Sequence, residues 1–312
     1  FQEWYIAHEH RTNHRHEAAS THFQQLSCDY PQTIHALQHL AVSRVQDGVP
    51  QSAMDVFEYI LQLDDCHLNA MDTYASVIKI RGRAERLHSL SQSFINIDPN
   101  RPEVWCTVAM NTEVAGRRDR ALDMVNRALK IAPRHVFAHL LKGALLLHKE
   151  RREESVVAFR RAYVLSRDLS SFQGMVQAHL QLRQTVAALR LAKEAYQRMP
   201  QNPRAMTLVG LVLSCDPAQR SKARKVLEQA LRLRSTCIEA TLCLTDLDVA
   251  ENQTEVALER LNDVLANDPS NAEFIHTKFA DILIHDNRLH EALDHFETAL
   301  SINPSSDVAA NG

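Results

Sequence analysis

The chain repeats itself about every 34 residues along almost the whole of its 312 residues. One landmark position recurs at spacings of 33, 34 or 35 residues, and six of its nine occurrences are proline: Pro31, Asp65, Pro99, Pro133, Arg167, Pro200, Ser235, Pro269 and Pro304. A fixed period of this length is typical of proteins built from stacked units. Because one such unit cannot bury its apolar stripe alone, each requires neighbours. The period therefore predicts a scaffold made of like units.

The unit that ends at Pro133 has the landmarks of a tetratricopeptide repeat. This repeat consists of two antiparallel helices with small residues where the helices touch, a turn between them and a closing proline. The corresponding residues are Trp105, Ala109, Gly116, Ala121, Val125, Ala128 and Pro133. The sequence between residues 102 and 135 therefore predicts one helical hairpin.

The second helix of every unit carries apolar residues at fixed spacing. A small residue comes first, a second apolar position follows four residues later, and a third follows after three more. This spacing keeps the three side chains on one helical face. The first position is occupied by Ala19, Ala53, Leu87, Ala121, Ser155, Ala188, Ala223, Ala257 and Ala292.

The pattern predicts an all-α fold, a tetratricopeptide-repeat superhelix (α-solenoid) of about nine helical hairpins. We expect a single solenoid over residues 1–306 and a polar C-terminal end at 307–312. The predicted repeats are 1–33, 34–67, 68–101, 102–135, 136–168, 169–203, 204–237, 238–272 and 273–306.

Three repeats depart from the common pattern. Leu87 and Ser91 replace a small and a large residue, which predicts looser or rearranged packing in repeat 68–101. The first helix of each repeat is expected to carry a small residue where it touches the second helix. In repeat 169–203 this residue, Gly174, stands two positions earlier than expected, which is consistent with the short spacing of that repeat. Pro217 falls where the first helix of repeat 204–237 would otherwise continue, and proline is not tolerated deep in a helix. We therefore expect a shortened helix and a distinctive turn there.

Composition excludes several classes of protein. With 7 Gly and 10 Pro, the chain has too few turn residues for an all-β fold. No apolar run reaches the roughly 18 residues of a membrane span. The charge (Lys+Arg minus Asp+Glu) is −6 for residues 1–67, +7 for 68–168, +8 for 169–237 and −12 for 238–312. This asymmetry favours charge-directed docking. Nucleic-acid binding is less favoured, because the basic residues 68–237 contain neither the cysteine and histidine spacing of a zinc site nor a glycine–aromatic motif of a nucleic-acid-binding sheet.

The sequence predicts no catalytic, cofactor or metal site. It contains no nucleophile elbow, phosphate-binding glycine loop or His-Glu-x-x-His segment. None of the 6 cysteines forms a Cys-x-x-Cys pair, which favours a reducing compartment. The N-terminal histidines invite a metal interpretation, but a predicted turn at Arg11–His16 separates His10 from His14, and we favour a solvated turn. His35 and His39 share a helix face, and for them we favour a structural or groove-lining role.

Eight cations fall at or beside the predicted turns between the first and second helices of four consecutive repeats. They are Arg81, Arg83, Arg117, Arg118, Lys149, Arg151, Arg152 and Arg183. Because successive hairpins stack in parallel, these turns line up along one edge, and we call the set the basic ridge. The corresponding turns near Asp47, Glu251 and Asp286 carry acids. The ridge is predicted to dock an acidic surface or tail, and a merely solvated edge is the alternative.

Four segments resemble the subunit 7 family of the anaphase-promoting complex (cyclosome), a ubiquitin ligase of the cell cycle. They are AHLLKGALL (138–146), ESVVAFRRA (154–162), AMTLVGLVLSCDP (205–217) and KARKVLEQAL (222–231). The Asp-Pro interruption is the most specific of these features. The resemblance implies a non-catalytic scaffold that lies against other tetratricopeptide subunits of the ligase, in the nucleus and cytoplasm. It also implies a homodimer formed through N-terminal sequence that is absent here, so we expect the chain to be a fragment.

Three alternatives stay open at this point. The chain could be a paralogous tetratricopeptide subunit of the same complex. It could be a general adaptor that binds a peptide tail in a concave groove. It could also be a regulatory segment of an enzyme whose catalytic domain precedes it. No nucleic acid, membrane or cofactor is expected in any of these cases.

Overall fold

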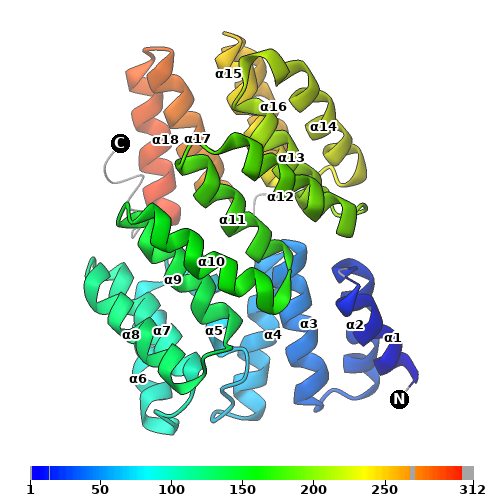
Figure 1. Ribbon diagram of the computed structural model, residues 1–312, viewed down its shortest axis with the longest axis vertical. Coiled ribbons are helices and arrows are strands. Elements are labelled where there is room, and N and C mark those ends of the chain that lie inside the picture. Colours follow the sequence, from blue (N-terminus) through cyan, green and yellow to red (C-terminus); the bar gives the residue numbers. More distant parts are fainter. Residues whose placement is uncertain (1, 14, 268–270, 304–312) are drawn as a thin grey trace. The chain divides into compact units, whose positions relative to one another are not determined.

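The computed structural model describes residues 2–13, 15–267 and 271–303, and all regular structure in this part of the chain is helical (Figure 1). It comprises eighteen α-helices and one short 3-10 helix, with no strand among the described residues. The predicted all-α fold class is therefore confirmed. The predicted polar end at 307–312 and the landmarks Pro269 and Pro304 lie outside the described residues.

The chain divides into two compact units, Phe1–Gln184 and Thr185–Gly312, called here the first and second unit. The first unit contains α1 (Gln2–Thr12), α2 (His16–Asp29), α3 (Ile34–Asp47), α4 (Pro50–Leu63), α5 (Met71–Ile80), α6 (Ala84–Ile97), α7 (Pro102–Val114), α8 (Arg118–Ile131), α9 (Val136–His148), α10 (Arg152–Ser166) and α11 (Leu169–Gln181). The second contains α12 (Thr185–Arg198), α13 (Pro203–Ser214), η1 (Pro217–Gln219), α14 (Arg220–Leu233), α15 (Ile238–Ala250), α16 (Thr254–Asn267), α17 (Ala272–His285) and α18 (Leu289–Ile302).

Each of the nine predicted repeats contains two of these α-helices. The predicted helix break between Arg11 and His16 is confirmed, because α1 ends at Thr12 and α2 begins at His16. In the repeat 169–203, α11 belongs to the first unit and α12 to the second.

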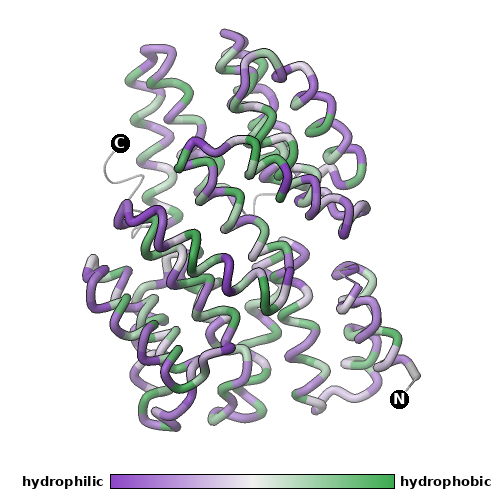
Figure 2. The backbone as a smooth tube through the Cα atoms, viewed as in Figure 1, coloured by the Kyte–Doolittle hydropathy of each residue, from purple (hydrophilic) through white to green (hydrophobic). Residues whose placement is uncertain are grey.

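The predicted landmarks form the core of the hairpins. All nine residues at the first small position of the second helices are at most 2% exposed. The residues four positions later are at most 4% exposed, and of the third set only Val264 is half-buried rather than buried. Burying one larger apolar side chain of this kind contributes about 1.5–3 kcal/mol. The register predicted from the sequence is therefore correct, and hydrophilic and hydrophobic residues alternate along second helices such as α8 and α14 (Figure 2).

Glycines allow a phenylalanine to pack between two helices of the first unit. The ring of Phe159 on α10 lies against Gly143 of α9 and Gly174 of α11. A Cβ added at these glycines would lie 2.7 and 2.3 Å from the nearest ring carbons. The displaced position of Gly174, noted in the sequence, thus matches the place where a neighbouring repeat inserts an aromatic ring.

The repeat 68–101 is repacked. Leu87 and Ser91 are at most 1% exposed, so the larger residue now fills the first position and the smaller one the second. The Ser91 hydroxyl donates to the carbonyl of His88 (2.7 Å) and accepts from the amide of Asn111 (3.2 Å). These bonds satisfy the polar group that the substitution introduces into the core.

The Asp-Pro interruption ends α13 early, as predicted. The helix stops at Ser214, and the 3-10 turn η1 leads into α14. The carboxylate of Asp216 accepts a hydrogen bond from the backbone N–H of Ala218 (3.0 Å), which caps this turn.

Among the described helices, none is long and apolar enough to cross a bilayer.

Candidate functional site: the basic ridge and a polar cluster between repeats

The residues of the basic ridge lie at the ends of the first helices and the starts of the second helices in the first unit. The turn residues Gly82, Gly116, Glu150 and Arg183 all adopt left-handed backbone conformations, with φ between 56° and 74°. The ridge side chains are exposed except for Arg81 and Lys149, which are half-buried. Lys149 pairs with Asp119 at the start of α8, so two consecutive turns adjoin.

Part of the ridge is neutralised within the protein. The guanidinium of Arg151, the residue before α10, binds the carboxylate of Glu154 in the first turn of that helix (2.6 Å), and Arg83 lies 3.9 Å from Glu58. Arg117, Arg118, Arg152 and Arg183 make no ion pair with any described residue. These four arginines are therefore the cations of the ridge most available to another molecule.

A buried carboxylate beside the ridge connects three first helices. Glu113 on α7 is bound by Lys79 of α5 (2.5 Å) and by His148 of α9 (3.2 Å), and its side chain is only 8% exposed. Burial opposes ionisation of Glu113, but the bonds to His148 and Lys79 outweigh it and lower the pKa of the carboxyl. These contacts of Glu113 were not predicted from the sequence, although residues 79, 113 and 148 recur at nearly the repeat spacing.

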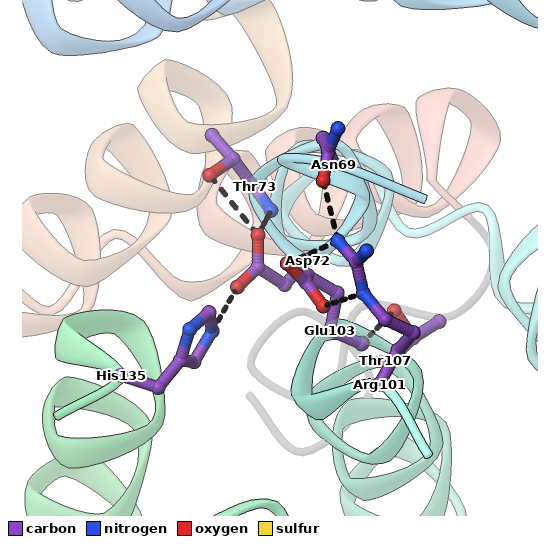
Figure 3. Close-up of polar contacts among 7 residues, drawn as sticks. All are labelled: Asn69, Asp72, Thr73, Arg101, Glu103, Thr107 and His135. Atoms are coloured by element: carbon purple, nitrogen blue, oxygen red, sulfur yellow. Dashed lines mark hydrogen bonds and ion pairs between the residues drawn. The ribbon is translucent and has the colours of Figure 1, made fainter. Parts of the chain in front are cut away.

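A second polar cluster lies where α5, α7 and the residue before α9 meet (Figure 3). His135 Nε2 and Asp72 Oδ2 are 2.7 Å apart, and the backbone N–H of Thr73 donates to the same carboxylate (2.7 Å). Asp72 is 3% exposed. The side chain of Arg101 binds both oxygens of Glu103 (3.1 and 3.2 Å) and donates to the amide oxygen of Asn69.

The periodicity of the chain contained a signal for this cluster. Arg101 and His135 occupy equivalent positions in consecutive repeats. His135 contacts Asp72 of the preceding repeat, whereas Arg101 contacts Asn69 of its own repeat and Glu103 of the next one. Asn69 and Glu103 are also equivalent, as are Asp72 and Cys106. The cluster therefore results from aligned repeat positions, although which side chains would pair could not be read from the spacing.

The Asp72–His135 pair makes stability depend on pH. Burial by itself lowers the pKa of His135, but the hydrogen bond and ion pair with Asp72 outweigh it and raise the pKa. A raised pKa means that folding favours the protonated imidazole. The stabilisation is thus complete below the unfolded-state pKa of about 6.5 and is lost as pH rises through the folded-state value.

We expect wild-type protein to exceed His135→Gln in unfolding free energy by more at acidic than at alkaline pH. Urea unfolding of both proteins at about pH 5.5 and 8.5 measures the difference, and the other histidines cancel in the comparison. A gap that stays constant or widens at the higher pH would contradict this assignment.

Asp72, Cys106 and His135 also raise the question of a metal. Each offers one ligand atom, and the three atoms lie within 4.8 Å of one another. However, the carboxylate already accepts from His135 and Thr73. Burial, followed by the nearby charges of Asp72 and Glu103, raises the pKa of the Cys106 thiol well above 9.0. Since zinc binds the thiolate, the residues are better described as a satisfied ion pair beside a buried thiol.

We expect purified protein to contain far less than one zinc per chain by elemental analysis. One zinc per chain that is lost in Cys106→Ser/His135→Gln would show that this cluster is a metal site. One that is lost in His10→Ala/His14→Ala would place the metal at the N-terminal histidines instead.

Several histidines of the first two repeats pack against aromatic rings or against one another. His39 stacks on Phe23 and meets His35, with ring centroids 5.3 and 4.5 Å apart. Burial, with Arg11, His35 and His8 nearby, lowers the pKa of His39 to about 3. It is therefore neutral at pH 7, which agrees with the structural role favoured from the sequence. His10 stacks on His22, whereas His14 lies outside the described residues.

The chain is similar to known proteins over most of its length. The tetratricopeptide repeat family model matches residues 113–170. Anaphase-promoting complex subunit 7 of Arabidopsis thaliana is 32% identical over 300 residues, which are 96% of this chain and 53% of that protein. The subunit 7 of Dictyostelium discoideum is 29% identical over 291 residues, 93% of this chain and 50% of the relative.

A solved structure shows the same fold. A chain in the crystal structure of the APC/C hetero-tetramer Cut9-Hcn1 matches 95% of this chain and 61% of its own length, with a TM-score of 0.66 and 16% identity. At this identity the likeness concerns the fold alone. The present chain spans about half the length of the subunit 7 relatives it matches. Its repeats are those of a tetratricopeptide-repeat protein, and over most of its length the chain is similar to subunit 7 of the anaphase-promoting complex.

Proposed function

We propose that this chain is part of a non-catalytic scaffold subunit of the anaphase-promoting complex, a ubiquitin ligase of the cell cycle. The observation that carries the proposal is the 32% identity to a subunit 7 over 96% of the chain. Both relatives described above are named subunit 7, which favours this subunit over a paralogous one. The proposal includes residence in the nucleus and cytoplasm and a homodimer formed through sequence N-terminal to this chain.

The pairing of charged groups supports a structural role over a catalytic one. The buried carboxylates of Asp72, Glu113 and Asp248 each lie against cations or histidines of other helices. A general acid or base needs access to substrate and a pKa suited to proton transfer. These carboxylates instead bind one helix to another, which is what a rigid scaffold requires.

We propose that electrostatic attraction joins this chain to a neighbouring subunit. The basic ridge would dock an acidic surface or tail of a neighbouring tetratricopeptide subunit. Because exposed ion pairs contribute only about 0–1 kcal/mol each, several arginines have to act together. Docking of this kind weakens as salt rises. The ridge arginines that make no ion pair with a described residue, Arg117, Arg118, Arg152 and Arg183, would contribute most.

Affinity purification of the tagged full-length protein tests this proposal. Wild-type protein is expected to recover the other subunits of the ligase. Changing Arg117, Arg118, Arg151 and Arg152 together to Glu is expected to reduce that recovery at low salt. A variant with Arg190, Lys193, Lys222 and Lys225 changed to Glu has the same charge difference outside the ridge and serves as the control.

Equal recovery with the ridge variant and the wild type at low salt would leave the ridge as a solvated edge. Failure of the wild type to recover any subunit would contradict membership of the complex itself. Recovery of chaperones in small and variable amounts would favour the alternative of a general peptide-binding adaptor.

A further inference from the structure

A groove separate from the basic ridge lies between α8 and α10 in the first unit, with α9 as its floor. Its volume is about 940 Å³. Four cations line it: Arg127 and Lys130 of α8, Lys142 of α9 and Arg161 of α10. None of these four belongs to the ridge.

The positive charge of the groove exceeds its negative charge. Asp123 and Glu154 are the acids of the lining, and Glu154 is already bound by Arg151 outside the groove. The guanidinium of Arg127 stacks 3.6 Å from the centre of the Trp105 ring, and Lys142 donates to the amide oxygen of Asn126 (2.8 Å). These contacts hold two of the cations in place before any partner arrives.

The same groove exposes apolar surface. On α10, Val157 in the groove and Val164 two turns further along are 58% and 69% exposed, with the exposed Arg161 between them. Residues at i, i+4 and i+7 share one helix face, so they form an alternating apolar and basic stripe. A face that only has to be solvated does not need two valines, which are also less favourable in helices than straight-chain residues.

These features select a helical partner. The backbone N–H and C=O groups in the middle of α8 and α10 are bonded within their own helices, so no strand can be added by backbone pairing. Recognition therefore depends on side chains, as it does when an amphipathic helix lies in a groove. Asp123 disfavours a polyphosphate, and Arg127 covers a face of the Trp105 ring on which a nucleic-acid base would stack.

We propose that the groove between α8 and α10 docks an acidic amphipathic helix of a partner protein, whose carboxylates meet Lys130 and Arg161 and whose apolar side chains cover Val157. The proposal rests on the proposed scaffold function and adds a second interface to it.

Fluorescence anisotropy tests the groove directly on the purified chain. The probe is a fluorescein-labelled helical peptide with Leu at every third or fourth position and Glu or Ala elsewhere, at about 50 mM salt. We expect saturable binding that weakens about tenfold in Lys130→Glu/Arg161→Glu. Arg117→Glu/Arg118→Glu makes the same charge change on the ridge and is expected to alter binding less than about twofold.

A second pair of variants separates shape from charge. Val157→Ser is expected to weaken peptide binding severalfold, whereas Val186→Ser, which changes an even more exposed valine outside the groove, is expected to have no effect. Circular dichroism checks that each variant keeps its helical content.

Three outcomes would overturn the proposal: absence of saturable binding, equal weakening by the groove and ridge variants, or displacement of the peptide by a single-stranded oligouridine that the groove variants no longer bind. The last outcome would indicate a nucleic-acid site. The affinity purification described above is independent, because a wild-type chain that binds the peptide but recovers no subunit would contradict only the scaffold function.

Discussion

Asp248→Ala is expected to destabilise the second unit by about 2–4 kcal/mol. The carboxylate of Asp248 on α15 is fully buried, and it binds Arg224 of α14 (2.6 Å) and Arg260 of α16 (3.1 Å). Its removal deprives two guanidinium groups of this counter-ion, and these groups are only 23% and 27% exposed. Their residual exposure to water places the cost below that of a fully buried pair.

A neighbouring ion pair on the same helix provides the control. Asp246 binds Lys278 at 2.5 Å but is 58% exposed, so Asp246→Ala is expected to cost less than about 1 kcal/mol. Urea unfolding followed by circular dichroism measures both variants. Equal losses of stability in the two variants would contradict the assignment of Asp248 as the carboxylate that connects three helices.

Gly174→Ala is expected to destabilise the first unit by about 1–3 kcal/mol. In an ordinary helix interior this substitution stabilises by up to about 1 kcal/mol, because alanine is the better helix former. Here the new methyl group would lie 2.3 Å from the Phe159 ring, so α10 and α11 have to move apart. Because of this contact, the substitution is expected to destabilise the protein, although helix propensity alone would make it stabilising.

A double-mutant cycle isolates this contact. Phe159→Leu alone is expected to lower stability, because it replaces a ring that is 4% exposed in the core. In that background Gly174→Ala is expected to cost less than it does in the wild type, since the smaller side chain leaves room for the methyl group. Additive effects of the two substitutions would contradict the packing of Phe159 between α9 and α11.

The hairpins could be predicted from the sequence because their core is local and periodic. Ala121, Val125 and Ala128 are spaced so that they share one face of α8, and all three are fully buried. In a stack of repeats, each repeat packs against its neighbours in nearly the same way. One correctly aligned repeat therefore fixes the buried positions of the others, including the exchanged sizes at Leu87 and Ser91.

The polar contacts could not be predicted in the same way. His135 pairs with Asp72 across 63 residues, and Asp248 binds arginines from the helices on both sides of it. Such pairs depend on side-chain rotamers and on the distances between helices, which the 34-residue period does not contain. For the same reason, the ion pairs that neutralise Lys149 and Arg151 of the ridge could not be predicted from the sequence.

The scaffold assignment is tested most directly by the composition of the assembly that contains the full-length protein. Tagged protein can be purified from cells, separated by size and quantified subunit by subunit with mass spectrometry. We expect it to elute with a large complex and in constant ratio to the other tetratricopeptide subunits of the anaphase-promoting complex across the peak. Elution of the protein alone, or with chaperones in variable ratio, would contradict the account.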